Sequence, residues 1–172
     1  MFGTKWSNNK KIPPNDRKGF TLVEIIVVIA IIVLVLATIL GFLSFDSRLA
    51  ERSRSRLTAL ALAQETIEAV RNFRDNTDWV TGIGILNVDI NYHPIKNSSG
   101  WNLASGNETL DGFTRAVVLN KISRDSNDNI ESSYNSVNND PDTRRIKVTV
   151  TWTDRQGPSD EILITYLTNW KK

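Results

Sequence analysis

The chain has 172 residues, of which 40 % are hydrophobic and 23 % charged, an ordinary globular mixture with room for one modest domain. The absence of cysteine excludes a disulfide bond, a cysteine-ligated metal and a cysteine nucleophile. The formal net charge is +2, but residues 1–19 alone carry a net charge of +4, and without them the chain carries −2. A mildly acidic body gives no support to nucleic-acid binding.

The N-terminus combines a short basic leader with a long apolar segment. The leader contains five basic residues and one acid: Lys5, Lys10, Lys11, Arg17, Lys18 and Asp16. Residues 25–43 then form nineteen positions without a charge, interrupted only by Thr38 and Gly41. As a helix they span roughly 28 Å, which matches the core of a bilayer. The many β-branched side chains favour a strand in water, but in lipid the cost of unpaired backbone groups forces a helix.

A different periodicity follows the apolar segment. Residues at spacings of three and four form one apolar stripe: Leu57, Leu60, Ala61, Gln64, Ile67, Val70 and Phe73. Arg and Glu residues oppose this stripe, which is typical of an amphipathic helix. Because no proline separates the stripe from the apolar segment, we expect one helix from about Thr21 to about Arg74, roughly 80 Å long.

The remainder of the chain is predicted to form a small β head. Residues 75–112 are dense in Asn, Asp, Gly and Ser and predict a loop-rich connection. Three later segments have strand patterns: residues 114–119, residues 145–153 with Ile146, Val148, Val150 and Trp152 on one face, and residues 161–170. A turn at residues 154–160 joins the last two as a hairpin. Residues 123–143 have neither period and predict a long mobile loop.

The junction between leader and apolar segment has a specific pattern. It consists of Lys18, Gly19, Phe20, Thr21, Leu22, Val23 and Glu24. A basic leader ends in glycine, phenylalanine follows, and the only charge in the next stretch is a glutamate at the fifth position after the glycine. This pattern resembles the class III signal of type IV prepilins and of the related pseudopilins. The resemblance implies that a prepilin peptidase cuts between Gly19 and Phe20 and methylates the new amine of Phe20.

The chemistry of the junction fits such a cut. Glycine leaves the backbone open to a protease, and the basic leader favours the cytoplasmic side of the membrane. Because the cut precedes the apolar segment, the anchor survives maturation, whereas an ordinary secretory signal loses its apolar region. Four arginines, at positions 48, 52, 54 and 56, nearly balance the leader, so the charge rule alone does not set the orientation, and the class III signal places the leader inside.

Glu24 is the candidate assembly residue. It lies about one helical turn from the new N-terminus, where an ionised carboxylate is costly unless it has a partner. The resemblance implies that it pairs with the Phe20 amine of a neighbouring subunit. The alternative is an interfacial glutamate that only caps the N-terminus of the helix, where carboxylates interact well with the helix dipole.

The resemblance extends less specifically into residues 59–75. An amphipathic stretch of this kind, followed by a small β head that ends in a hairpin, is similar to minor pilins and secretion-system minor pseudopilins. One departure is Gly41, which stands where many pilins carry a helix-kinking proline.

These elements together predict an α+β fold. A long N-terminal helix, embedded in the membrane over its first half and amphipathic over its second, packs on a small antiparallel β-sheet head. We expect four segments: a cleaved leader at 1–19, the membrane and assembly half of the helix at 20–45, its amphipathic half at 46–75, and the loop-rich head at 76–172.

Weaker signals favour ordinary structural roles. Residues 125–131 begin like a calcium loop, but the glycine at the sixth place is missing and Ser136 replaces the bidentate glutamate, so we interpret them as a solvated loop. The arginines at 48–56 are expected to snorkel or to pair with acids rather than to bind DNA. His93 is expected in a surface loop, and Trp79, Trp101, Trp152 and Trp170 are expected in the packing of the head.

The leading hypothesis is a structural subunit, minor pilin-like, of a type IV pilus or a type II secretion pseudopilus. The alternative is a membrane-anchored or filament-tip binding module, an adhesin or a DNA binder. An enzyme is not expected, because no nucleophile, base and orienting group occur at a plausible spacing, and the sequence offers no catalytic residue, metal site or cofactor site.

The resemblance also implies partners and a location. The partners are other pilin or pseudopilin subunits through helix–helix packing, prepilin peptidase, membrane lipid and an inner-membrane assembly platform, with no nucleic acid. The location is the cytoplasmic (inner) membrane, crossed once with the leader inside and the head outside, and after assembly a cell-surface or periplasmic filament.

Overall fold

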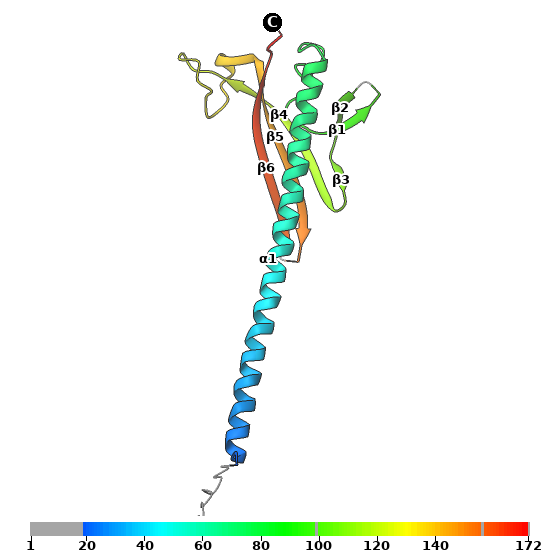
Figure 1. Cartoon of the computed structure of the whole chain (residues 1–172). Coiled ribbons are helices and arrows are strands. Elements are labelled where there is room, and N and C mark those ends of the chain that lie inside the picture. The colour runs from blue at the N-terminus through cyan, green and yellow to red at the C-terminus, as the bar shows by residue number, and fades with distance from the viewer. Residues whose placement is uncertain (1–18, 99, 156, 172) are drawn as a thin grey trace, which may run out of the picture. The chain divides into compact units, whose positions relative to one another are not determined.

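One long helix and one antiparallel sheet make up the structure, a computed structural model that describes residues 19–98, 100–155 and 157–171 (Figure 1). The basic residues of the leader lie outside the described residues. The chain divides into two compact units, Met1–Ser47 and Arg48–Lys172. The helix α1 (Leu22–Asn76) belongs to both units, which confirms the prediction of one uninterrupted helix.

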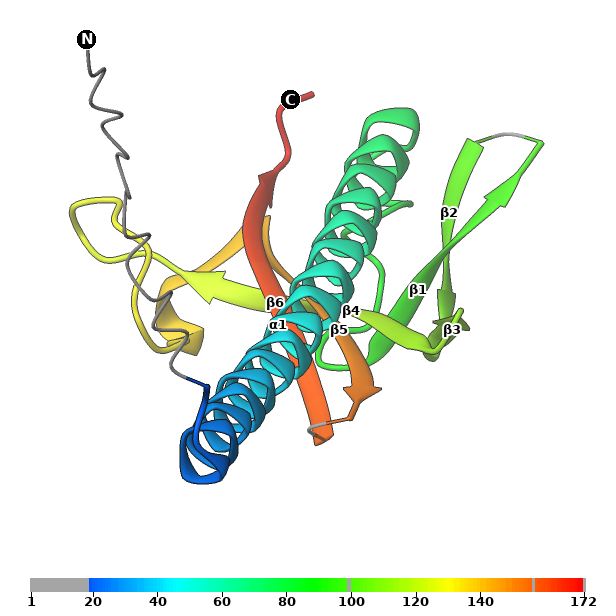
Figure 2. The same ribbon diagram turned by 60° about the horizontal axis from the view of Figure 1, so that its bottom comes forward.

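The sheet lies entirely in the second unit. Its strands are β1 (Asn91–Asn97), β2 (Gly100–Ser105), β3 (Glu108–Leu110), β4 (Phe113–Ser123), β5 (Asn139–Asp154) and β6 (Gly157–Thr168). The strand order is β2-β1-β4-β5-β6, with β3 paired to β4, and every pairing is antiparallel. A short 3-10 helix, η1 (Ser136–Asn138), precedes β5. Within this unit the second half of α1 lies across one face of β4, β5 and β6, so the α+β class is confirmed (Figure 2).

The core of the head lies between α1 and the sheet face that it covers. The sheet contributes alternating side chains that are buried: Val117, Leu119, Ile146, Val148, Val150, Trp152 and Leu167. The period of two along β5 therefore places its apolar residues on the covered face, as the sequence predicts. This layer of large side chains is what the helix packs on.

The helix face that meets the sheet differs from the predicted stripe. The buried helical residues are mostly small or medium in size, with Phe73 as the large exception: Ala59, Ala63, Thr66, Ile67, Ala69, Val70 and Phe73. Ala61 and Gln64 are exposed, and so is Leu57 with 66 % of its surface, so these three assignments are wrong. Small residues allow a helix to approach a sheet of larger side chains closely, and apolar periodicity alone does not weigh size. The prediction holds for Ile67, Val70 and Phe73.

This packing predicts that enlarging the buried alanine face destabilises the head. Ala63 is fully buried, so Ala63→Leu should lower the free energy of unfolding by about 1–3 kcal/mol, since three extra carbons have no space. Urea unfolding of the mature protein in detergent micelles, followed by tryptophan fluorescence, measures it. The matched control is Ala61→Leu on the exposed face, which should change the free energy by less than about 0.5 kcal/mol. Equal effects of the two changes would contradict the packing.

Two segments predicted as loops contain strands. Residues 75–112 include β1, β2 and β3, and β5 begins at Asn139, inside the predicted loop 123–143. Pro94 lies within β1. This strand pairs with β4 only at Asn91 and Tyr92, so from His93 onward the edge that faces β4 has no strand partner. An unpaired edge is where a strand tolerates proline. Composition identifies the turn residues correctly, but the short strands between them have no clear periodicity.

The C-terminal hairpin is confirmed with a tighter turn than predicted. Asp154 pairs with Gly157, so the strand resumes at once instead of after residue 160. Gly157 has a φ of +122°, a conformation that glycine adopts without strain. Trp170 lies beyond β6, is 62 % exposed and donates its indole N–H to the Asp75 carboxylate at 3.1 Å. Trp170 therefore links the C-terminal segment to the end of α1 by a hydrogen bond and does not lie in the core.

Candidate functional site at the N-terminal helix

The helix α1 begins with a side-chain cap. The backbone N–H of Glu24 donates to the Thr21 hydroxyl oxygen at 3.2 Å, and the N–H of Ile25 donates to the Thr21 carbonyl oxygen at 3.2 Å. Thr21 thus satisfies a helix-end donor that would otherwise be costly in lipid. The sequence holds a signal for this role, because a threonine three residues before a glutamate has the spacing of a capping box, but the cap was not among the predictions.

The carboxylate of Glu24 is not used by this cap. It makes no hydrogen bond or ion pair with any residue in the described part of the chain, and Gly19, Phe20 and Glu24 are all exposed. The arrangement places one acidic side chain in the first turn of an otherwise apolar helix, four residues after Phe20. A positive group brought to this turn would find a carboxylate ready to pair.

The apolar half of α1 has no packing partner within the described part of the chain. Its large apolar side chains between Phe20 and Phe45 are 47–78 % exposed. Among the described residues this is one helix that is long and apolar enough to cross a membrane, by length and composition. A Cβ added at Gly41 would meet no neighbouring atom within 4 Å, so no contact within the described part of the chain requires a glycine at this position.

Arginines follow the apolar half of the helix. The Arg56 guanidinium lies 3.0 Å from the Glu161 carboxylate, and the Arg155 guanidinium lies 3.7 Å from that of Glu51. The predicted pairing of this cluster with acids is confirmed for Arg56. Both ion pairs join the helix to β6 or to the β5–β6 turn.

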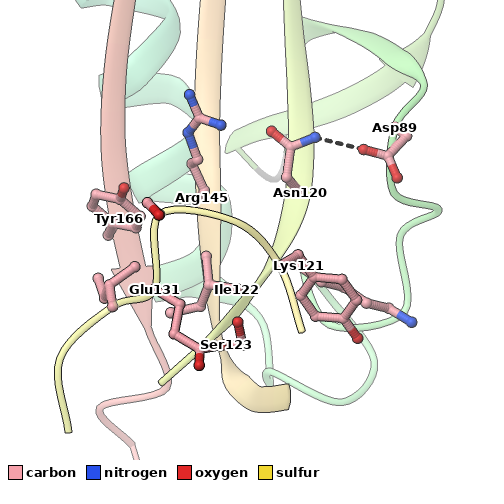
Figure 3. A pocket seen from close by; sticks show the side chains of 11 residues that line it. Asp89, Asn120, Lys121, Ile122, Ser123, Glu131, Arg145 and Tyr166 are labelled. Carbon is pink, nitrogen blue, oxygen red and sulfur yellow. Dashed lines mark hydrogen bonds between the residues drawn. The ribbon is translucent and has the colours of Figure 1, made fainter. Parts of the chain in front are cut away.

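A second candidate site is a cavity of about 600 Å³ on the sheet face opposite α1 (Figure 3). The strand register aligns Asn120 of β4, Arg145 of β5 and Tyr166 of β6 in one row across its floor. Asn120 donates to the Asp89 carboxylate at 2.6 Å, whereas the Arg145 guanidinium bonds to none of the described residues. Glu131, on the loop over the row, accepts from Asn138 through Oε1 at 3.0 Å, and its buried Oε2 makes no hydrogen bond with the described residues.

Sequence reasoning did not find this cavity. Its lining residues come from three strands and two loops, and only the register brings them together. Arg145 and Tyr166 are 21 positions apart in the sequence but face each other across β5 and β6. No local motif marks such a pair.

The loop that begins like a calcium site is held by its own backbone. The Asp125 carboxylate accepts N–H groups of Asn129 and Asn127 at 2.9 and 2.8 Å, and these bonds lower the pKa of Asp125. The turn therefore occupies the Asp125 carboxylate oxygen that a bound cation would need as a ligand. The described residues contain no group of three or more His, Cys, Asp or Glu side chains that could hold a metal. His93 lies in β1 rather than in a loop, with Nδ1 3.3 Å from the Gly106 carbonyl oxygen.

The ion pair below this loop predicts an acid-sensitive head. Burial raises the pKa of Asp140, but the bonds from Arg124 at 2.8 Å and from Thr143 and the Asp142 N–H outweigh it, and the pKa lies below its usual range. A lowered folded pKa contributes stability above the unfolded pKa, about 3.9, which is lost as the pH falls through the folded value. The melting temperatures of wild type and of Arg124→Gln should differ at pH 6, and the difference should shrink as the pH falls below about 3.9, the unfolded pKa. A gap between them that stays constant down to pH 2 would contradict this linkage.

Comparison with known proteins shows that the N-terminal pattern matches one family model. Residues 14–40 match the family model of the prokaryotic N-terminal methylation motif, and the match includes Gly19, Phe20 and Glu24. No curated protein and no solved structure is significantly similar to the chain. The motif points to a pilin-type structural subunit rather than an enzyme, and it implies processing by prepilin peptidase and assembly with other pilin-like subunits. The chain therefore carries the N-terminal methylation signal of the type IV prepilin-like proteins.

Proposed function

We propose that the chain is a minor pilin-like structural subunit of a type IV pilus or a type II secretion pseudopilus. Before assembly it is held in the cytoplasmic membrane by the apolar half of α1, crossing once with the leader inside and the head outside. After extraction it joins a filament at the cell surface or in the periplasm, through an inner-membrane assembly platform.

The observation that carries the proposal is the exposed apolar half of α1. Large side chains with about half or more of their surface exposed are strongly unfavourable in water, since each fully buried Leu or Ile is worth about 1.5–3 kcal/mol. Two environments remove this cost, a bilayer and the helices of neighbouring subunits. A filament subunit uses the first before assembly and the second afterwards.

Processing at Gly19 prepares the chain for both environments. Removal of residues 1–19 leaves a mature chain that starts at Phe20, directly before the Thr21 cap. The remaining segments are the membrane and assembly half at 20–45, the amphipathic half at 46–75 and the head at 76–172. The new amine is methylated and lies four residues from Glu24.

In the filament, Glu24 pairs with the Phe20 amine of a neighbouring subunit. The carboxylate has no bond within the described part of the chain, and a lone ionised carboxylate among apolar helices is costly without a cation. The alternative, a glutamate that only caps its own helix, receives less support because the Thr21 hydroxyl already serves as the cap.

Cell fractionation tests the proposal. The mature protein should divide between the inner membrane and the sheared filament fraction, and loss of the prepilin peptidase should leave the precursor in the membrane only. Mature protein that is released in soluble form, with no membrane or filament fraction, would contradict it.

A second candidate function is a binding module, favoured by the row of Asn120, Arg145 and Tyr166. An Arg that bonds to none of the described residues suits a carboxylate, the half-exposed Tyr ring suits an apolar ring face, and the buried Glu131 oxygen suits a hydroxyl donor. A sugar acid combines a carboxylate, an apolar ring face and hydroxyl donors.

Titration of the micelle-bound protein with glucuronate, with glucose as the control, should give saturable binding, and Arg145→Gln should abolish it. Equal binding of both sugars would remove this candidate function.

A further inference from the structure

A small cavity lies in the second unit beside the first residues of α1 that belong to it, Arg48 to Arg52. It has a volume of about 250 Å³ and is lined by Arg48, Glu51 and Arg52 of α1 and by Asp154 and Arg155 at the tip of the β5–β6 hairpin. The Arg155–Glu51 pair at 3.7 Å and the neighbouring Arg56–Glu161 pair at 3.0 Å hold the hairpin against the helix. Little more than one turn of the helix and the tip of the hairpin therefore form its walls.

The cavity has an excess of one positive charge. Three guanidinium groups and two carboxylates line it, and the Glu51 carboxylate pairs with Arg155. The Arg48 guanidinium makes no hydrogen bond or ion pair with the described residues. Guanidinium groups present planar pairs of donors that match phosphate oxygens, and Arg48 and Arg52 are four residues apart, on one side of the helix.

The position of the cavity along α1 selects the source of the phosphate. Arg48 follows Phe45 by three residues and Arg52 follows it by seven, which puts them about 4.5 and 10 Å along the helix axis from the last apolar side chain of the membrane half. The polar headgroup layer on each side of a bilayer is about 5–8 Å thick. When the apolar half spans the bilayer core, Arg48 lies at the depth of the lipid phosphates, whatever the orientation of the head.

We propose that this cavity binds the phosphodiester of one membrane phospholipid while the subunit awaits assembly. The proposal rests on the proposed function, because it requires the helix to be in a bilayer. Arg48 and Arg52 supply donors from the helix, and Arg155 closes the site from the hairpin. Leaving the membrane for a filament then includes the release of this lipid.

Native mass spectrometry of the mature protein from a phosphate-free maltoside detergent tests the proposal. Added phosphatidylglycerol should be retained as one bound lipid, and Arg48→Gln should weaken retention about tenfold, the effect of one charge-assisted hydrogen bond. Arg54→Gln is the matched control, since this exposed arginine has the same charge and helix but does not line the cavity. It should retain the lipid like wild type.

Three further results would overturn the assignment. Equal retention by Arg48→Gln and wild type would remove the site, and equal retention of a diacylglycerol without phosphate would remove the phosphate. Displacement of the lipid by millimolar inorganic phosphate would identify a soluble ion as the ligand. Failure of the wild-type protein to enter detergent micelles at all would instead contradict the membrane anchor of the proposed function, so the two failures are distinguishable.

Discussion

Replacing Glu24 by alanine should leave the protein in the membrane and remove it from filaments. Loss of a charge from an apolar helix makes insertion easier, so the membrane amount should stay within about twofold of wild type. On the proposed function, the variant cannot form the proposed ion pair with a neighbour's Phe20 amine, a charge-assisted bond worth about 1.5–3 kcal/mol, so incorporation into filaments should fall at least tenfold. Quantitative immunoblots of sheared filaments and of membranes measure both amounts.

Two further substitutions separate the ion pair from a capping role and from a general effect of losing one acid. Glu24→Gln retains the shape and a neutral acceptor, so it should be defective if the charge matters and nearly normal if the residue only caps its helix. Asp46→Asn removes the exposed acid at the other end of the apolar half and should assemble like wild type. Wild-type incorporation of both Glu24 variants would remove the role assigned to this carboxylate.

Removing Glu108 should destabilise the head far more than removing an exposed acid. The Arg115 side chain is 5 % exposed and lies 2.7 Å from the Glu108 carboxylate and 3.3 Å from that of Glu65, which joins β4 to β3 and to α1. Glu108→Ala leaves a buried guanidinium with one weaker partner, so it should cost about 3 kcal/mol in free energy of unfolding. Urea unfolding in micelles gives the value.

The chain offers a matched control and a rescue for this experiment. Glu68→Ala breaks the exposed pair with Arg71 and should cost at most about 1 kcal/mol. Arg115→Met in the Glu108→Ala background removes the buried charge and should recover much of the lost stability, because a buried pair replaced by an apolar side chain is often neutral. A double variant that is less stable than Glu108→Ala would show that Arg115 contributes through packing instead.

The sequence predicts the elements whose patterns are strong and local. The membrane half of α1 has no charge over nineteen residues, and β5 alternates over residues 145–153, so both are recognisable without a structure. The strands β1, β2 and β3 have three to seven residues each and lie among Gly, Asn and Pro, so only pairing with neighbours reveals them. The predicted helix face is wrong at Leu57 because the period identifies apolar residues, whereas the sheet selects the small ones at Ala59 and Ala63.

In the candidate sites, too, the sequence identifies the residues that are close together along the chain and misses those that only the fold brings together. Gly19, Phe20 and Glu24 lie within six consecutive positions, so a local pattern identifies them, and the residues that match the family model include all three. The Arg115 cluster and both cavities join residues that are far apart along the chain, as with the 50 positions between Glu65 and Arg115, and a single sequence holds no record of those contacts. The absence of any bond from Glu24 within the described part of the chain likewise required the structure.

The N-terminal mass of the protein extracted from membranes tests the central claim most directly. The proposed cut after Gly19 leaves the apolar helix in place, so the mature chain should begin at Phe20 and carry one methyl group on the amine. Top-down mass spectrometry resolves the cleavage site and the methylation in one spectrum. A chain that begins at Met1, or one that begins beyond Leu43 and has lost the apolar segment, would contradict the assignment as a prepilin-type subunit.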